Sequence, residues 1–230
     1  MTGTIGARTL EVLENARNYN RWTYERVRGA LGQHVLEIGC GTGTITQFLT
    51  GRDLVMGIDV DPANVLAAQK RFANTPNVVI RLLDVAISVD ELRPYHFDSA
   101  LSVNVFEHIL DDQAALKAVH AVLDPGGTLA LLVPAHPFLM SPFDRAIGHH
   151  RRYTKRDLRL KLEAAGFRVE RLRRSNPTGA LGWMVNNVWL RRTELRGIGL
   201  YDRLVPVLAA ADRVLELPMG LSILASGRKI

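Results

Sequence analysis

The sequence predicts an α/β domain with a mostly parallel sheet of seven strands and helices on both faces. Three observations lead to this prediction. Short apolar runs alternate with helix-forming segments through the first 134 residues. Strands buried on both faces of a parallel sheet have such continuous apolar runs, and their connecting helices cover the sheet. The chain has 230 residues, of which 47% are hydrophobic, and this suffices for one sizeable core.

Seven segments carry the strand pattern. Most are apolar runs bounded by glycine, asparagine, aspartate or proline, which are the residues that commonly end strands. The sixth segment alternates apolar and basic residues, as a half-exposed strand does. The expected strands are residues 34–38, 54–58, 77–82, 97–103, 128–133, 167–172 and 218–227.

Helices are expected before, between and after these strands. Pro62 opens a run of good helix formers, and the turn signal at residues 124–127 ends the helix before the fifth strand. The expected helices are a lead-in at 11–30, the segments 44–49, 62–72, 113–123 and 155–165, and an added helical cover at 179–211 before the last strand. The single domain over 1–230 then divides into a lead-in (1–32), a ligand-binding core (33–134) and a recognition region with the last strands (135–230).

Composition narrows the class of protein. The formal net charge of +6 suits an anionic partner, and it equally suits simple solubility. Cys40 is the single cysteine, so a disulfide framework and a cysteine metal cluster are excluded. No apolar run reaches the length of a membrane span, and the first residues lack the apolar core of a signal peptide. We therefore expect a cytoplasmic protein, with peripheral membrane contact left open.

A glycine-rich turn follows the first expected strand and carries the strongest functional signal. Gly39, Gly41 and Gly43 occupy alternate positions, where a missing Cβ lets a ligand approach the backbone. The third glycine comes one residue too early for the dinucleotide fingerprint, and no Lys-Ser/Thr pair follows as in a phosphate-binding P-loop. Glu37 beside the turn would repel a pyrophosphate, and its carboxylate suits a ligand with an ammonium group.

The segment E-x-G-C-G-T-G from Glu37 resembles the first motif of the Rossmann-like (class I) S-adenosylmethionine methyltransferases. Four further segments resemble later motifs of that family in the same order: Gly-Ile-Asp-Val-Asp at 57–61, Leu-Asp-Val at 83–85, Val-Asn-Val-Phe-Glu-His at 103–108 and Asp-Pro-Gly-Gly at 124–127. The resemblance covers residues 35–133. It implies a Rossmann-like fold, S-adenosyl-L-methionine as the cofactor, and no metal.

The same resemblance implies roles for individual residues. Asp59, at the end of the second strand, takes the two ribose hydroxyls, because a carboxylate can accept two O–H bonds at once. Asp84 accepts from the adenine amine. Each carboxylate also has a simpler reading: Asp59 as a helix N-cap before Pro62, and Asp84 as a solvated loop residue. The remaining expected cofactor contacts are Tyr19, Glu37, Gly39, Cys40, Gly41, Gly43, Val60, Val85, Asn104 and Val105.

Two of these expected contacts, Cys40 and Tyr19, also have structural interpretations. Cys40 is interpreted as a small packing residue of the turn and not as a nucleophile. Tyr19 lies on the lead-in helix with Asn20 and Trp22. This helix either closes over the cofactor, as N-terminal helices of relatives do, or simply docks on the sheet.

Methyl transfer by this family is an in-line displacement in which the protein mainly positions the acceptor. An oxygen or nitrogen acceptor usually loses a proton, and a histidine titrates in the right range to take it. Four histidines are candidate bases: His108, His136, His149 and His150. His108 follows the fourth strand and is expected at the carboxyl edge of the sheet, so it is the first choice.

A second segment, residues 144–154, follows the fifth strand. It resembles a D-x-x-x-G-H-x-R-R-Y-[ST] signature of bacterial methyltransferases found beside, or fused to, glycosyltransferases. Its histidines, arginines and tyrosine could bind an anionic or polyhydroxyl acceptor, or form a solvated basic face around one packed tyrosine. His150 and Tyr153 join His108 as candidate catalytic residues. The surrounding stretch 145–174 holds eleven Arg or Lys and three Asp or Glu, which suits phosphate binding or a charge-defended sheet edge.

The sequence thus predicts S-adenosylmethionine-dependent methyl transfer to an oxygen or nitrogen of a small molecule that is sugar-bearing, lipid-like or a secondary metabolite. Two alternatives remain. An RNA methyltransferase is favoured by charge alone; Val-Phe after Asn104 differs from the Pro-Pro-aromatic motif of base-amine methylation, so nucleic acid is not expected. A non-catalytic module that binds S-adenosylmethionine is opposed by the complete glycine turn. The cover at 179–211 could enclose an apolar acceptor or form a homodimer contact.

Overall fold

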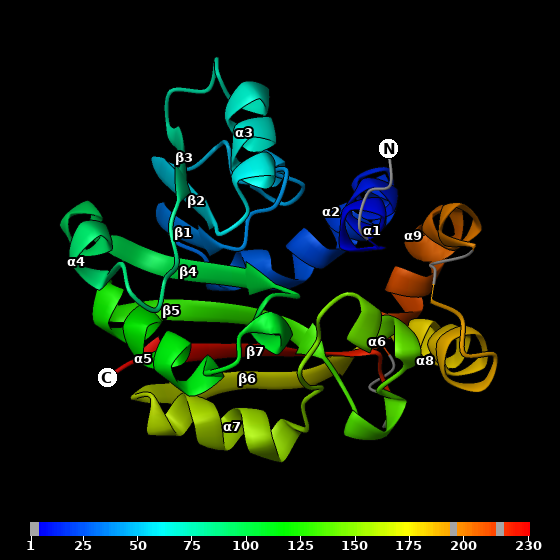
Figure 1. Ribbon diagram of the computed structural model, residues 1–230. Helices are drawn as coiled ribbons and strands as arrows, with labels where there is room; N and C mark the ends of the chain where they lie inside the picture. The colour runs from blue at the N-terminus through cyan, green and yellow to red at the C-terminus, as the bar shows by residue number, and fades with distance from the viewer. Residues whose placement is uncertain (1–4, 194–196, 215–218) are drawn as a thin grey trace.

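The computed structural model describes residues 5–193, 197–214 and 219–230. It contains a seven-stranded sheet in the order β3-β2-β1-β4-β5-β7-β6 (Figure 1). β7 runs antiparallel to both of its neighbours, and the pairs among β1 to β5 are parallel. The strands are β1 His34–Ile38, β2 Leu54–Asp59, β3 Val78–Leu82, β4 Phe97–Val103, β5 Leu123–Pro134, β6 Phe167–Ser175 and β7 Ser222–Lys229. The predicted mostly parallel seven-stranded sheet is confirmed.

Helices cover both faces of this sheet. The principal helices are α1 Ile5–Glu14, α2 Arg17–Val27, α3 Pro62–Arg71, α4 Val89–Leu92, α5 Asp112–Val122, α6 Pro142–Ala146, α7 Lys155–Ala164, α8 Pro177–Trp183 and α9 Ile198–Val214. A π-helical segment, Met184–Trp189, continues α8. Because side chains alternate along a strand, neighbours such as Val35 and Leu36 enter different cores. Leu36 packs with residues of α4, α5 and α7, while Val35 packs with residues of α2 and α3.

The lead-in is two helices and not the single helix predicted at 11–30; residues 1–4 of the lead-in lie outside the described residues. α1 ends at Glu14, α2 begins at Arg17, and a 3-10 turn at Arg28–Ala30 follows. Asn15 interrupts the helix because its side-chain amide donates to the carbonyl oxygen of Glu11 at 2.9 Å. Local bonding of this kind by asparagine competes with the helical backbone pattern.

The helix predicted at 44–49 is also absent; only a 3-10 turn, Thr46–Phe48, forms there. Three of its six residues, Thr44, Ile45 and Thr46, are β-branched, which lowers the helix propensity. The Thr46 hydroxyl is engaged by Glu37, which fixes the turn against β1. The glycine loop therefore leads into a short turn and not into a regular helix.

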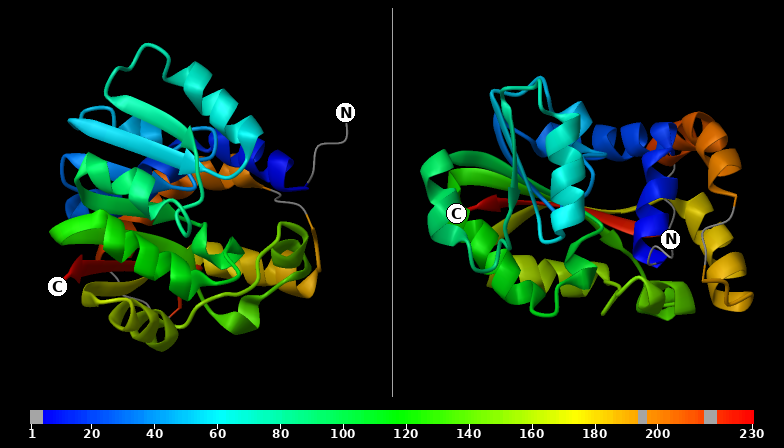
Figure 2. Two further views of the ribbon diagram at one scale, coloured as in Figure 1. Left: turned by 60° about the vertical axis from the view of Figure 1, so that its left-hand side comes forward. Right: turned by 45° about the horizontal axis from the view of Figure 1, so that its top comes forward.

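The C-terminal additions lie beyond the carboxyl ends of the parallel strands. Figures 1 and 2 show α9 beside α1 and α2, with α8 and α6 nearby. Asp202 of α9 accepts from the backbone N–H of Tyr19 at 2.8 Å, and Asp212 forms an ion pair with Arg26 of α2. The predicted helical cover is present, with residues 194–196 outside the described part. The last strand begins at Ser222, later than predicted; residue 218 also lies outside the described part. No described helix is long and apolar enough to cross a membrane.

Candidate functional site

The loops that follow β1, β2, β3 and β4 meet at one edge of the sheet. Parallel strands present their carboxyl ends together, and open α/β sheets bind ligands at this edge where the strand order reverses. Here the reversal lies between β1 and β4, since β2 and β3 extend to one side and β5 to the other. The residues expected to bind a cofactor follow these strands.

The glycine loop is shaped by its backbone and by its neighbours. Gly39, Gly41 and Gly43 all have positive φ, which glycine adopts readily. A Cβ at Gly39 would lie 2.3 Å from Val105, and one at Gly43 would lie 2.3 Å from the Phe72 ring. At these two positions the missing side chain makes room for the protein's own residues. The sequence reasoning had assigned that space to a ligand.

Asp59 joins two loops of the site. One carboxylate oxygen accepts from the backbone N–H of Gly41 at 2.8 Å, and the other accepts from Asp61 at 2.9 Å. The N-cap of α3 is Asp61, which accepts from Ala63 at 2.8 Å. The simple capping role considered for Asp59 is therefore filled by a different residue. The Asn64 side-chain amide also donates to the oxygen that binds Asp61, at 3.4 Å, so that oxygen is shared by two donors. The oxygen that binds Gly41 retains a lone pair for a further donor.

The residues near Asp59 divide between surface and core. Val60 is 68% exposed, so its apolar side chain is open at the edge. Asp84 is exposed and accepts from the backbone N–H of Ala86 at 2.9 Å. Val85 differs from its expected role as a cofactor contact, because its side chain is buried in the core. Asn104 has a positive φ at the end of β4, and its N–H donates to Leu132.

Two residues of the first motif are withdrawn from solvent. Glu37 is buried and accepts from the Thr46 hydroxyl at 2.6 Å. Burial, with a contribution from Asp59, raises the pKa of Glu37 to about 7. Cys40 is buried too, and burial raises the pKa of its thiol, which suits the packing role predicted for it. No ammonium partner of Glu37 is present among the described residues.

Tyr19 lies in an aromatic group on the lead-in. Its ring contacts Trp22 edge-on, with centroids 5.9 Å apart, and contacts Tyr201 of α9 at 6.4 Å. Burial raises the pKa of the Tyr19 hydroxyl to about 12, and Glu107 is close enough to contribute. Docking of the lead-in against α9 accounts for these contacts.

Glu107 and His108 follow β4, and His149 approaches them from the segment after α6. We call these three residues the histidine cluster. Their donor atoms all lie within 4.8 Å of one another. The Nε2 atom of His149 is 3.7 Å from a Glu107 oxygen, and the His108 and His149 rings meet edge-on at 4.6 Å. Glu107 is fully buried, and burial raises its pKa to about 8.

His108 is the exposed member of the histidine cluster. Loss of surrounding water, together with the nearby His149 ring, lowers the pKa of His108 to about 4. The imidazole is therefore neutral near pH 7. The sequence analysis did not assign Glu107 to the site and ranked His149 below His150 as a candidate base. The Glu-His pair after β4 and the D-x-x-x-G-H spacing are the sequence signals that point to these two residues.

Asp144 explains much of the second motif. Its carboxylate is fully buried and accepts from Ser141, from His149 at 2.8 Å and from Arg152 at 2.8 Å. Although burial opposes ionisation, the hydrogen bond from His149 and the charge of Arg152 lower the pKa of Asp144 to about 2. Gly148, with positive φ, turns the chain between Asp144 and His149. Arg152 is buried in this pair, so it is not free to bind an acceptor.

Tyr153 has a structural place and not the catalytic contact expected of it. Its side chain is buried, and its hydroxyl lies 2.8 Å from Asp112 and 3.1 Å from the Phe106 carbonyl oxygen. Asp112 also pairs with Arg151 at 2.9 Å and with Lys161 at 2.8 Å. The packed tyrosine agrees with the structural alternative for this motif. The two arginines are paired with carboxylates and do not form the solvated basic face of that alternative.

His150 and His136 complete the set of expected bases. His150 is exposed, and its backbone N–H donates to the carbonyl oxygen of Glu107 at 2.8 Å. This bond ties the second motif to the loop after β4. His136 has positive φ, and its buried Nε2 makes no hydrogen bond within the described residues.

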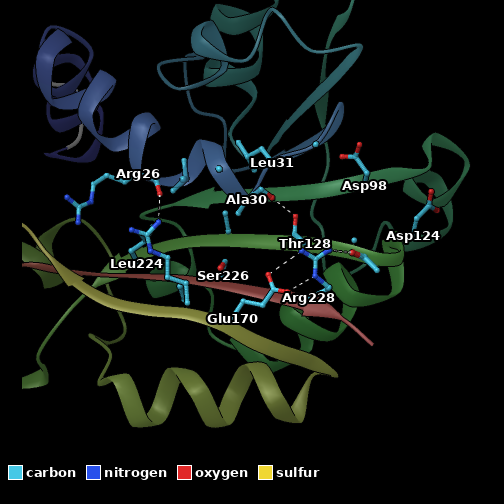
Figure 3. A pocket seen from close by; sticks show the side chains of 18 of the residues that line it. Arg26, Ala30, Leu31, Asp98, Asp124, Thr128, Glu170, Leu224, Ser226 and Arg228 are labelled. Atoms are coloured by element: carbon cyan, nitrogen blue, oxygen red, sulfur yellow. Dashed lines mark hydrogen bonds and ion pairs between the residues drawn. The ribbon is translucent and has the colours of Figure 1, made fainter. Parts of the chain in front are cut away.

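A separate pocket of about 520 Å³ lies toward the amino ends of β4 and β5, at the edge opposite the site (Figure 3). Arg228 in its wall is bound by Glu170 at 2.6 Å, and the Thr128 hydroxyl donates to Ala30. Its charges are largely paired, and none of the expected site residues lines it.

Comparison with known proteins agrees with this arrangement. Residues 36–129 match the family model of a methyltransferase domain. An uncharacterized methyltransferase of Mycobacterium tuberculosis is 38% identical over 108 residues, covering 46% of this chain and 53% of the relative. The ubiquinone biosynthesis O-methyltransferase of Pseudomonas fluorescens is 32% identical over 108 residues, covering 46% of each chain. The chain thus spans about half the length of the curated relatives it matches.

A solved S-adenosylmethionine-dependent methyltransferase from Mesorhizobium loti superposes with a TM-score of 0.58 at 20% identity. The match covers 88% of this chain and 95% of that one, and at this identity it establishes the fold. Residues 36–129 are thus similar to a methyltransferase domain, and the chain shares its fold with this S-adenosylmethionine-dependent methyltransferase.

Proposed function

We propose, on the premise that residues 36–129 form a methyltransferase domain, that the chain transfers a methyl group from S-adenosyl-L-methionine to an oxygen or nitrogen of a small-molecule acceptor. The observation that carries this proposal is the position of Asp59. Its carboxylate spans the glycine loop and the turn before α3, and the oxygen that binds Gly41 keeps a lone pair for a hydroxyl donor.

The residues at this edge fit the cofactor. Asp59 would hold the ribose hydroxyls, the exposed Val60 side chain would cover the adenine face, and Asp84 would accept from its amine. Glu37 would face the ammonium group, with a pKa near 7 that a cation would lower by favouring the carboxylate. When bound, the sulfonium supplies an electrophilic methyl group.

The acceptor would enter beside His108. Because the pKa of His108 is about 4, its imidazole is neutral near pH 7 and has a lone pair to accept a hydrogen bond or a proton from the acceptor, but it is a weaker base than an ordinary histidine. His150 is exposed next to it and would contact the acceptor. Tyr153 would act as a positioning residue, because its hydroxyl connects Asp112 with the loop that carries Glu107 and His108.

Oxygen is the favoured acceptor atom, since ubiquinone biosynthesis O-methyltransferases of Pseudomonas are among the relatives. The cover beyond the site favours an acceptor with an apolar part. Exposed apolar side chains gather on α8, the π-helical segment after it, and α9: Leu181, Val185, Trp189, Leu190, Leu200, Leu204 and Val207. Surfaces of this kind suit contact with a lipid-like molecule.

Calorimetric titration with S-adenosyl-L-methionine, and separately with NAD and NADP, tests the cofactor assignment. We expect micromolar binding of S-adenosyl-L-methionine alone, with loss of affinity in Asp59→Ala. A folded sample that binds none of it would overturn the proposed activity, and binding without turnover on any acceptor would favour a non-catalytic module. Salt-dependent RNA binding would instead revive the RNA alternative.

A further inference from the structure

The buried carboxylate of Glu107 is the least accounted-for charge near the site. The side chain is fully buried, and neither oxygen receives a hydrogen bond from another described residue. The neighbouring Asp144 is different, because Arg152 neutralises it at 2.8 Å. A buried carboxyl group without a partner is costly, and native structures usually satisfy it with a cation, a hydrogen bond or a metal ion.

Two imidazoles converge on this carboxylate. Asp144 accepts from Nδ1 of His149 at 2.8 Å, which leaves Nε2 directed toward Glu107, 3.7 Å away. A carboxylate that holds the far nitrogen of a histidine is the arrangement that commonly orients a metal-binding imidazole. His108 adds a second ring, and the three donor atoms lie within 4.8 Å of one another.

We propose that Glu107, His108 and His149 bind a divalent transition-metal ion such as Zn²⁺, Mn²⁺ or Co²⁺. Two imidazoles and one carboxylate form a mixed nitrogen and oxygen set that these ions prefer, whereas Mg²⁺ and Ca²⁺ prefer oxygen ligands alone. Donor atoms around Zn²⁺ are separated by roughly 3.4 Å, given bond lengths of about 2.0–2.1 Å. From the limit of 4.8 Å, the widest separation would contract by up to about 1.4 Å to reach this spacing.

The site is open on one side. Glu107 is buried beneath, and His108 is exposed, so an ion would enter from the His108 side and keep free coordination positions there. Binding of the ion is independent of the proposed methyl transfer, but its use rests on that function. At those positions the ion would hold an acceptor oxygen and make its hydroxyl easier to deprotonate. His108 would then be a ligand, in place of its role as a base.

The test uses tag-free full-length protein that has been treated with chelator and dialysed. Calorimetric titration with ZnCl₂ and MnCl₂, and visible absorption on adding CoCl₂, measure binding. We expect about one ion per chain. Glu107→Gln and His149→Ala should each weaken metal affinity. The loss should be at least the roughly ten- to hundredfold that follows removal of a residue hydrogen-bonded to a metal ligand. His150→Ala, one residue along the chain, should bind the ion like the parent.

Circular dichroism and S-adenosyl-L-methionine titration of each variant keep the outcomes separate. Absence of saturable binding, or equal affinity in all four proteins, would overturn the metal site. If the cofactor still binds in that case, the proposed methyl transfer survives. If metal binding depends on Glu107 and His149 but the chain does not bind the cofactor, the metal site is supported and the proposed function is overturned.

Discussion

The loop that contains Asp59 and the histidine cluster lie at the same edge of the sheet but are held by contacts of different range. Asp59 binds the N–H groups of Gly41 and Asp61, which belong to loops of two adjacent strands. His149 is oriented by Asp144 and faces Glu107, and the loop beneath it depends on the bond between Tyr153 and Asp112, 41 residues apart. The proposed cofactor side is therefore local in sequence, and the proposed acceptor side depends on long-range packing.

This difference predicts which changes affect folding and which affect ligand binding. On the acceptor side, charged residues of the second motif should contribute mostly to stability. On the proposed cofactor side, Asp59 at the end of β2 should contribute mostly to affinity, whereas the buried Glu37 of β1 also affects stability. Four substitutions test the contrast.

Arg152→Ala should cause the largest effect. It leaves the buried Asp144 carboxylate without its guanidinium and removes the contact of Arg152 with the Trp183 ring, at 4.6 Å. Breaking a buried pair in this way costs about 3–5 kcal/mol of unfolding free energy. Urea denaturation measures the loss, with the exposed Arg145→Ala as the control, expected within about 0.5 kcal/mol of the parent. Equal midpoints for the two variants would contradict the structural role of Arg152.

Glu37→Gln should stabilise the chain at high pH. The pKa of Glu37 is about 7 in the fold, above its ordinary value of 4.5, so the folded state holds the proton longer. Parent stability therefore falls as pH rises from about 4.5 to about 7, by up to about 3 kcal/mol. The amide avoids this cost, and each kcal/mol corresponds to about 2–4 °C in Tm. Calorimetric scans at pH 5 and pH 8 should show a much larger gain at pH 8; a variant less stable at both would contradict it.

Asp59→Ala should weaken S-adenosyl-L-methionine binding by about 1–3 kcal/mol, the usual value of charged hydrogen bonds, which is roughly five- to 150-fold in Kd. Asp59→Asn keeps one acceptor oxygen and should fall between the parent and the alanine variant. Titration calorimetry gives the three affinities. Parent-like binding by Asp59→Ala would remove the ribose assignment.

His150→Ala should have the smallest effect on binding. It should spare cofactor affinity and lower the turnover number, because the exposed side chain lies on the acceptor side. Steady-state kinetics with saturating cofactor measures the loss. A collapse of cofactor affinity in this variant would break the division of the site into two sides.

Much of the fold was predictable because the strands and turns in residues 34–134 are specified by nearby residues. The five parallel strands, the glycine turn and the polar residues after each strand follow from short apolar runs and their terminators. The failures are local as well: Asn15 interrupts the lead-in, and Thr46 bonds to Glu37 where a helix was expected. The Asn15 side chain competes with the helical backbone, whereas Thr46 is held by a side chain of β1, and the apolar pattern reports neither bond.

The sequence by itself determined the sheet and the edge where the glycine turn and Asp59 meet, because motif spacing places those groups at the ends of adjacent strands. Only the tertiary structure decided the acceptor side. It buried Arg152 and Tyr153, left His150 exposed, and brought Glu107 to His149 across two separate loops. Burial and pairing depend on which distant segments pack together, and no local pattern in residues 144–154 shows whether a charge faces solvent or another charge.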